Sequence, residues 1–138
     1  MLAEPKYGWT EFTFENFKCS PSYLTDVPID MLSCIESFLK TGSGACWFDC
    51  EGSTYTFILS PDGAYIISDG NKLQNLTPEN YLTTDCKFQI AQEIIHDIET
   101  HLDSWTTWEP NALNEQEPEN YKRLLIQKIQ DIRKLISE

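Results

Sequence analysis

The chain has 138 residues, of which 22 are Asp or Glu and 10 are Lys or Arg, so its formal net charge is −12. Apolar residues make up 41% of the chain and aromatic residues 12%, a composition that excludes an intrinsically disordered protein. An acidic surface repels phosphates, so the charge also argues against binding to nucleic acid. The length is typical of one domain, and we expect a single α+β domain over residues 1–138.

The negative charge is unevenly distributed along the chain. The first 121 residues carry 20 acids and five bases, and the other five bases follow them. From Asp85 to Glu119 there are nine acids and one base. Such a surplus exceeds what solubility requires and opposes the compact state by self-repulsion. A cationic partner is its simplest explanation.

Two features of the sequence bear on its compartment. Residues 1–6 lack the basic and apolar segments of a secretory signal, and no apolar stretch reaches the roughly 18 to 20 residues that span a bilayer. The five cysteines contain no CxxC pair, which favours reduced and mostly buried thiols over disulfides or a metal site. We therefore expect a cytoplasmic protein that does not bind a membrane.

The first half of the chain predicts four strands and one helix. Residues 9–14 alternate in polarity and predict a first strand. A helix over about 28–40 follows, because Asp26 can cap it and Pro28 suits its first turn. Three short strands come next, separated by hairpin-length turns that contain glycine, and Trp47 in the first of them is expected in the core. These three strands are residues 45–50, 54–60 and 64–68.

The second half of the chain predicts two further helices. Apolar residues recur at steps of three and four within residues 85–103, the strongest helical pattern in the sequence. After a polar linker, a third helix begins at Pro118 with its acids near the N-terminus and its bases near the C-terminus, as the helix dipole favours. The predicted fold class is therefore α+β, with an antiparallel four-stranded sheet packed against about three helices.

No catalytic motif stands out in the sequence. Glu93 and His96 form an ExxH pair and His101 lies nearby, which would offer ligands to a divalent ion, but the second ExxH of a di-iron bundle is missing. Neither histidine accompanies a nucleophile signature, and residues 42–44 lack a phosphate-binding pattern. We expect no enzymatic activity, no cofactor and no resident metal, and keep a small hydrolase or metal enzyme built on these three residues as a rival hypothesis.

Three segments occur in an order that is typical of a known class of proteins. They are Ser22-Tyr23-Leu24-Thr25-Asp26-Val27-Pro28 before a helix, Trp47-Phe48-Asp49-Cys50-Glu51-Gly52 at the start of the strand meander, and an acidic helix that ends in Trp105-Thr106-Thr107-Trp108. Over about residues 8–108 the chain resembles the small acidic immunity proteins of bacterial polymorphic toxin and contact-dependent growth inhibition systems. This resemblance implies a cytoplasmic, non-catalytic protein that binds the toxin domain of its own system and blocks its active site.

The charge and the resemblance lead to the same functional expectation. We expect the chain to neutralise a cognate toxin, a basic nuclease, by covering its active-site cleft, because carboxylates compete with phosphate for such a cleft and steer association. The alternative is an acidic adaptor or regulatory subunit that binds a basic endogenous protein. In either case we expect a monomer or a weak dimer.

The expected contact surface lies on the acidic helix and the aromatic segment that follows it. Trp105 and Trp108 can either anchor a partner or close the core from outside, and the sequence leaves both readings open. The residues expected to bind the partner are Glu93, Asp97, Asp103, Trp105, Trp108 and Glu109, followed by Asp62 and Asp69 in the hairpin region.

Overall fold

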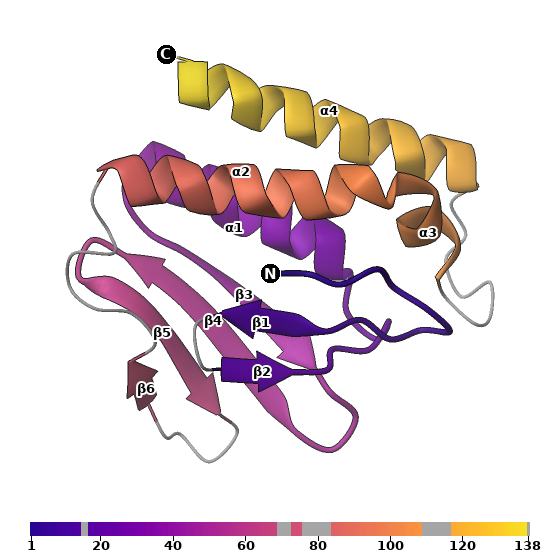
Figure 1. Cartoon of the computed structure of the whole chain (residues 1–138), viewed down its shortest axis with the longest axis horizontal. Helices are drawn as coiled ribbons and strands as arrows, with labels where there is room; N and C mark the ends of the chain where they lie inside the picture. The colour runs from indigo at the N-terminus through magenta and orange to yellow at the C-terminus, as the bar shows by residue number, and fades with distance from the viewer. Residues whose placement is uncertain (15–16, 69–72, 76–83, 109–116, 138) are drawn as a thin grey trace.

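The computed structural model describes residues 1–14, 17–68, 73–75, 84–108 and 117–137, and only the backbone of residues 73–75 and 84–87. Figure 1 shows three of the helices on one side of a twisted sheet, with a small two-stranded sheet in front of it. None of the described helices is both long and apolar enough to cross a bilayer. The elements in chain order are β1 (Phe12–Phe14), β2 (Phe17–Cys19), α1 (Val27–Thr41), β3 (Gly44–Asp49), β4 (Thr54–Ser60), β5 (Gly63–Ser68), β6 (Leu73–Asn75), α2 (Thr84–Thr100), α3 (Leu102–Thr107) and α4 (Pro118–Ser137).

Helix α1 forms where local signals predict it. The carboxylate of Asp26 accepts a hydrogen bond from the Ile29 N–H at 3.4 Å, and Pro28 lies in the first turn. Gly42 ends the helix with a φ of 90°, and its N–H donates to the Phe38 carbonyl at 2.9 Å. The next element begins at Gly44, where an added Cβ would lie 2.2 Å from the Cys34 carbonyl oxygen. This glycine therefore permits the close approach of α1 and β3.

Strands β3, β4, β5 and β6 form one antiparallel sheet in this order. Its first three strands agree with the predicted meander, and β4 begins and ends where it was expected. The prediction of a single four-stranded sheet that starts with residues 9–14 is wrong, because β1 pairs with β2 in a sheet of its own. The Phe12 ring of β1 packs against Phe48 at a tilt and against Phe57 edge to face, at centroid distances of 4.9 and 5.0 Å, so this strand lies on the face of the sheet and does not extend it.

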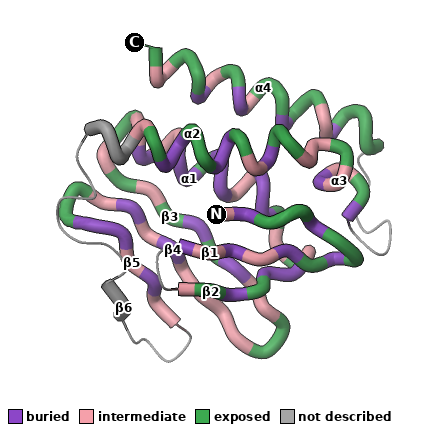
Figure 2. The backbone as a smooth tube through the Cα atoms, in the orientation of Figure 1, coloured by how far each residue is buried: buried purple, intermediate pink, exposed green. Residues whose placement is uncertain are grey.

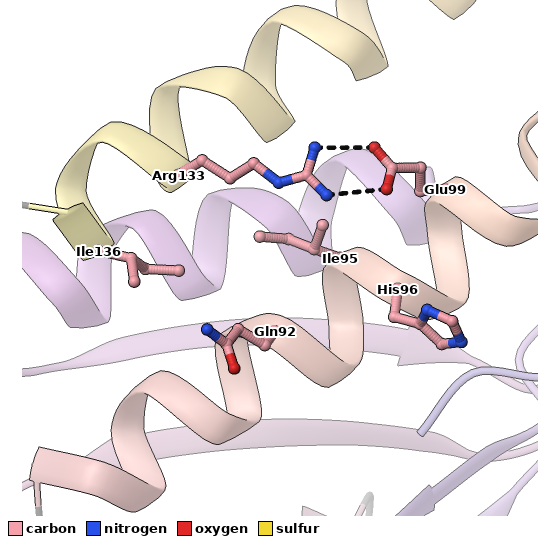
Figure 3. Close-up of a pocket in the computed structure, with 6 residues that line it drawn as sticks. All are labelled: Gln92, Ile95, His96, Glu99, Arg133 and Ile136. Atoms are coloured by element: carbon pink, nitrogen blue, oxygen red, sulfur yellow. Dashed lines mark hydrogen bonds and ion pairs between the residues drawn. The ribbon is translucent and has the colours of Figure 1, made fainter.

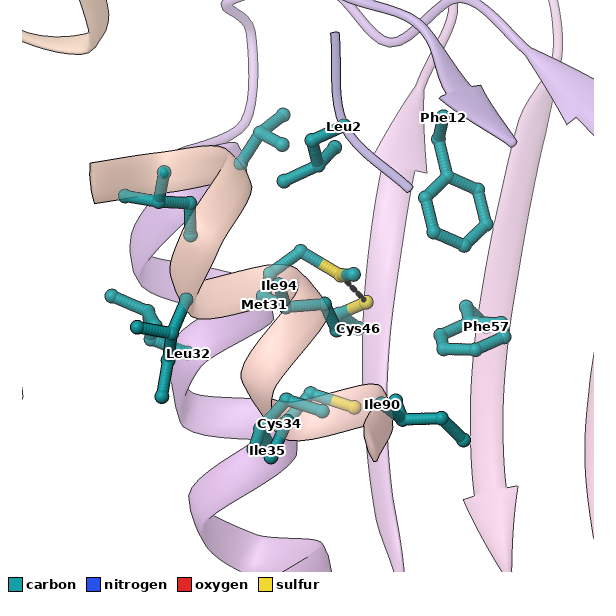
Figure 4. Packing of buried hydrophobic residues seen from close by; sticks show 14 of the residues in the cluster. Leu2, Phe12, Met31, Leu32, Cys34, Ile35, Cys46, Phe57, Ile90 and Ile94 are labelled. Carbon is teal, nitrogen blue, oxygen red and sulfur yellow. Dashed lines mark hydrogen bonds between the residues drawn. The ribbon is translucent and has the colours of Figure 1, made fainter. Parts of the chain in front are cut away.

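One face of the sheet carries the core. Its inward residues pack against α1, α2 and β1, and the Cys46 thiol lies 3.1 Å from the Met31 sulfur (Figure 4). Alternation along the strands decides which aromatic residue is buried: Phe48 has no exposed surface, whereas 48% of the surface of Trp47 is exposed. The expectation that Trp47 belongs to the core is therefore wrong.

The helical layer differs from the prediction in one respect. The second helix was expected to continue to residue 103, but α2 ends at Thr100 and α3 starts at Leu102. His101 leaves the helical conformation with a ψ of 39°, and the short α3 turns the chain so that the Trp105 side chain is completely buried. Helix α4 lies outermost and packs on α1, α2 and α3 (Figure 1).

Candidate functional site

Two acids of the predicted contact surface, Asp97 and Asp103, make contacts within the molecule. Asp97 on α2 accepts a hydrogen bond from the Leu2 N–H at 2.9 Å and lies 3.7 Å from the N-terminal ammonium group. Asp103 on α3 forms an ion pair with Lys122 of α4 at 2.8 Å. These two carboxylates hold the N-terminal segment and α4 in place, so they are not free anionic groups.

Helix α4 neutralises a further acid of α2. The Arg133 guanidinium makes two hydrogen bonds to the Glu99 carboxylate, at 2.8 and 2.9 Å (Figure 3). These bonds hold the pKa of Glu99 below its usual range. Two of the five C-terminal bases noted in the sequence, Lys122 and Arg133, therefore have acidic partners within the chain.

The two tryptophans after α2 close the core. Trp105 has no exposed surface and Trp108 only 5%, and their rings meet edge to face at a centroid distance of 5.3 Å. The Trp105 indole N–H finds no hydrogen-bond acceptor among the residues that the structure describes. Of the two readings left open by the sequence, the structure supports the packing role, because buried rings cannot anchor a partner.

The other predicted contact residues do not assemble into one surface. Glu93 is exposed on α2 and accepts a hydrogen bond from the Gln89 amide at 3.2 Å. Asp62 is exposed in the turn between β4 and β5, at the opposite end of the molecule from α3 (Figure 1). Glu109 and Asp69 lie outside the described residues.

The histidines of the rival metal hypothesis lie apart. His96 lines a shallow depression of about 300 Å³ between α2 and α4, beside the Glu99–Arg133 pair (Figure 3). His101 has its Nδ1 at 3.8 Å from the Glu4 carboxylate. Within the described part of the chain, no three His, Cys, Asp or Glu side chains are grouped so that they could hold a metal ion.

The outward face of the sheet is a more coherent candidate. The register places Trp47, Thr56 and Ile67 in one row across three strands, and Ile58 and Tyr65 in the next row. Figure 2 shows the alternation of buried and more exposed residues along these strands. Trp47 is exposed and the other four are half-buried, and none of these side chains belongs to the hydrophobic core. We call these five residues the outer sheet face.

Carboxylates lie at both ends of the outer sheet face. Asp49 follows Trp47 by two positions and so lies on the same side of β3, and Glu51 is exposed in the next turn. Asp62 is exposed at the other end of β4. With the described residues, none of these three acids forms an ion pair. The surface therefore combines an apolar centre with an anionic rim.

A strained aromatic residue lies near the Asp49 end of β3. Lys6 and Trp9 exchange two backbone hydrogen bonds, which close a two-residue turn in which Tyr7 and Gly8 both have positive φ. Tyr7 is 90% exposed, and a φ of 53° is unfavourable for a residue of its size. The Gly8 carbonyl accepts from the Tyr23 N–H, and the Ser22 N–H donates to the Asp49 carbonyl, which ties the turn to β3.

Sequence reasoning did not single out this turn or the outer sheet face. The Tyr7-Gly8 pair was the local signal for the turn, because glycine in second position is typical of two-residue hairpins. The alternation of residues along β3 was also visible in the sequence. Which of its two faces is buried depends on contacts with α1 and β1, which the sequence does not show.

No protein-family model, curated protein or solved structure shows a significant match to the chain.

Proposed function

We propose that this chain is a non-catalytic cytoplasmic binding protein that covers a cationic site on a protein partner, and that its outer sheet face makes the contact. The observation that supports the proposal is an exposed Trp47 on the edge strand β3, beside a half-buried and mostly apolar surface that no other described element covers. Trp is the residue most enriched among strong binding contacts, and contiguous apolar patches on soluble proteins commonly mark interfaces.

The anionic rim indicates what kind of partner fits. Asp49 and Glu51 lie at one end of the outer sheet face and Asp62 lies at the other, and the whole chain has a net charge of −12. A cationic partner gains both long-range steering and short-range ion pairs at this rim. We infer that the partner carries a basic cleft, as a nuclease does, and that the chain acts as the immunity protein of a toxin system. An endogenous basic protein bound by an adaptor would present the same chemistry.

A co-expression experiment tests the proposal. The chain is produced together with the product of the neighbouring open reading frame, and complex formation is measured by affinity purification and calorimetry. Trp47→Ala should weaken the complex by about 2 kcal/mol or more, because an aromatic anchor at the centre of an interface is lost. Leu124→Ala is the matched control, since Leu124 is a similarly exposed apolar residue on α4.

The outcomes separate the two candidate partners. Rescue of cell growth by the chain when the neighbouring product is toxic supports the immunity role, whereas a complex with a harmless basic protein supports the adaptor. Equal binding by the Trp47 and Leu124 variants would contradict the assignment of the outer sheet face.

A further inference from the structure

Strand β3 is the first strand in the sheet order, so one of its edges has no neighbouring strand among the described elements. Two hydrogen bonds show which peptide groups point to that edge. The Cys50 N–H donates to the Ser53 carbonyl across the hairpin, whereas the Asp49 carbonyl accepts from the Ser22 N–H on the other side. Peptide groups alternate along a strand, so those of Ala45 and Trp47 point away from β4, as that of Asp49 does.

This edge is accessible at Ala45 and Trp47, whereas the segment around Ser22 already covers its Asp49 end. Ala45 and Trp47 are both exposed, and their outward N–H and C=O groups have no backbone partner within the part of the chain that the structure describes. Natural edge strands are commonly blunted by Lys, Pro or a bulge. The segment Gly44–Asp49 contains neither Lys nor Pro, and its pairing with β4 runs without a bulge.

Charge favours one type of occupant for this edge. Asp49 ends the strand and Glu51 follows in the turn, and neither forms an ion pair with the described residues. A second copy of this chain would bring a further charge of −12 against the same edge. The acids at this edge would repel a second copy, whereas they attract an extended segment with basic side chains.

We propose that the free edge of β3 receives an extended cationic segment of the partner as an additional strand of the sheet. The N–H and C=O groups of Ala45 and Trp47 hydrogen-bond the main chain of that segment, and every second side chain of the segment lies beside Trp47 on the outer sheet face. Basic side chains of the segment meet Asp49 and Glu51. This inference rests on the proposed function and specifies how the same surface binds.

A pair of substitutions at one position isolates the main-chain contact. Ala45→Pro removes the outward N–H and places a ring in the path of an added strand, whereas it leaves the hydrogen bonds to β4 in place. Ala45→Thr keeps the N–H and suits a strand, so it is the matched control. The melting temperature of each variant shows whether the fold is retained.

The probe is a seven-residue peptide of alternating Lys and Val with blocked termini, together with a Glu and Val counterpart. The Lys peptide should bind the natural protein and the Thr variant, and bind the folded Pro variant at least about tenfold more weakly. The Glu peptide should not bind. In the natural protein, the amide protons of Ala45 and Trp47 should exchange quickly and become protected at least about tenfold when the Lys peptide is added.

Several results would overturn strand addition. They are equal binding by the Pro and Thr variants, no binding of the Lys peptide up to about 1 mM, or unprotected amides in the complex. If the Trp47→Ala variant loses the natural partner while Ala45→Pro retains it, the proposed function survives and strand addition fails. If the natural protein dimerises and Ala45→Pro abolishes the dimer, the occupant is a second copy and the proposal is wrong.

Discussion

At the scale of single residues, Asp30 is a carboxyl group whose environment opposes its charge. It lies in the first turn of α1, where burial and, to a smaller extent, the neighbouring charge of Asp26 together raise its pKa from 3.8 to about 6. The folded state therefore holds this proton more tightly than the unfolded chain does. As a result, the free energy of unfolding contributed by this group falls as the pH rises from about 4 to about 6.

Replacement of Asp30 by a neutral residue should restore the unfolding free energy that is lost as the pH rises. Asp30→Asn is expected to raise the free energy of unfolding at pH 7.5 by about 1 kcal/mol, after allowance for solvent screening of a half-buried group, and to leave it unchanged at pH 3.5. Urea unfolding at a series of pH values measures both. Asp62→Asn removes the same charge from an exposed turn and is the matched control. If Asp30→Asn raised the free energy of unfolding at pH 3.5 as well, the gain would not come from removal of the Asp30 charge.

Two tryptophans should respond very differently to truncation. Trp105 fills the core with no exposed surface, so Trp105→Ala is expected to cost about 3 to 5 kcal/mol of unfolding free energy. Trp47 is half exposed and outside the core, so Trp47→Ala should cost no more than about 1 kcal/mol. Denaturant titration followed by circular dichroism compares them. Similar losses for both variants would contradict the burial of one ring and the exposure of the other.

At the scale of elements, the turn of residues 6–9 holds the exposed Tyr7 at a positive φ, which lowers the stability of the fold. Asn tolerates positive φ better than Tyr and is favoured in the first position of such turns, so Tyr7→Asn should stabilise the fold by about 0.5 to 1 kcal/mol. If the ring contributes to the interface near Asp49, the same substitution should weaken partner binding. Thermal unfolding and calorimetry together test this. A variant that is both more stable and fully able to bind would assign the turn no part in recognition.

Elements with strong local signals were predictable from sequence. The Asp26 cap and Pro28 located the start of α1, and glycine-containing turns located β4 almost to the residue. The elements that were missed have no comparable local signal. Strands β2 and β6 pair with the strands just before them, but each has only three residues, too few to show an alternating pattern, and α3 separates from α2 at His101 without glycine or proline.

The candidate site was less predictable than the fold, because the partners of its acids are distant in sequence. Asp97 and Asp103 looked like parts of a binding surface, but tertiary packing brings the N-terminal segment to Asp97 and Lys122 of α4 to Asp103. Trp105 and Trp108 looked equally suited to surface and core until α3 turned them inward. Composition indicated a cationic partner, but it could not indicate which carboxylates remain unpaired.

At the scale of the whole molecule, part of the negative charge of the helical side is paired. Helix α4 forms ion pairs with Glu99 and Asp103, whereas Asp49, Glu51 and Asp62, at the ends of the outer sheet face, form none with the described residues. Electrostatic steering depends on the unpaired groups nearest the contact, because salt screens charges that lie more than about 10 Å from it.

That distribution predicts where charge controls association. The double variant Asp49→Asn, Glu51→Gln should slow association with the co-expressed partner by about threefold to tenfold at low salt and flatten its dependence on ionic strength. Asp131→Asn with Glu119→Gln removes the same total charge from α4, so it should leave the rate nearly unchanged if steering is local. Stopped-flow measurements between 20 mM and 300 mM salt, about one order of magnitude in ionic strength, compare the two. Equal slowing by both variants would mean that net charge alone drives encounter, and a selective effect of the α4 pair would place the contact on the helical side.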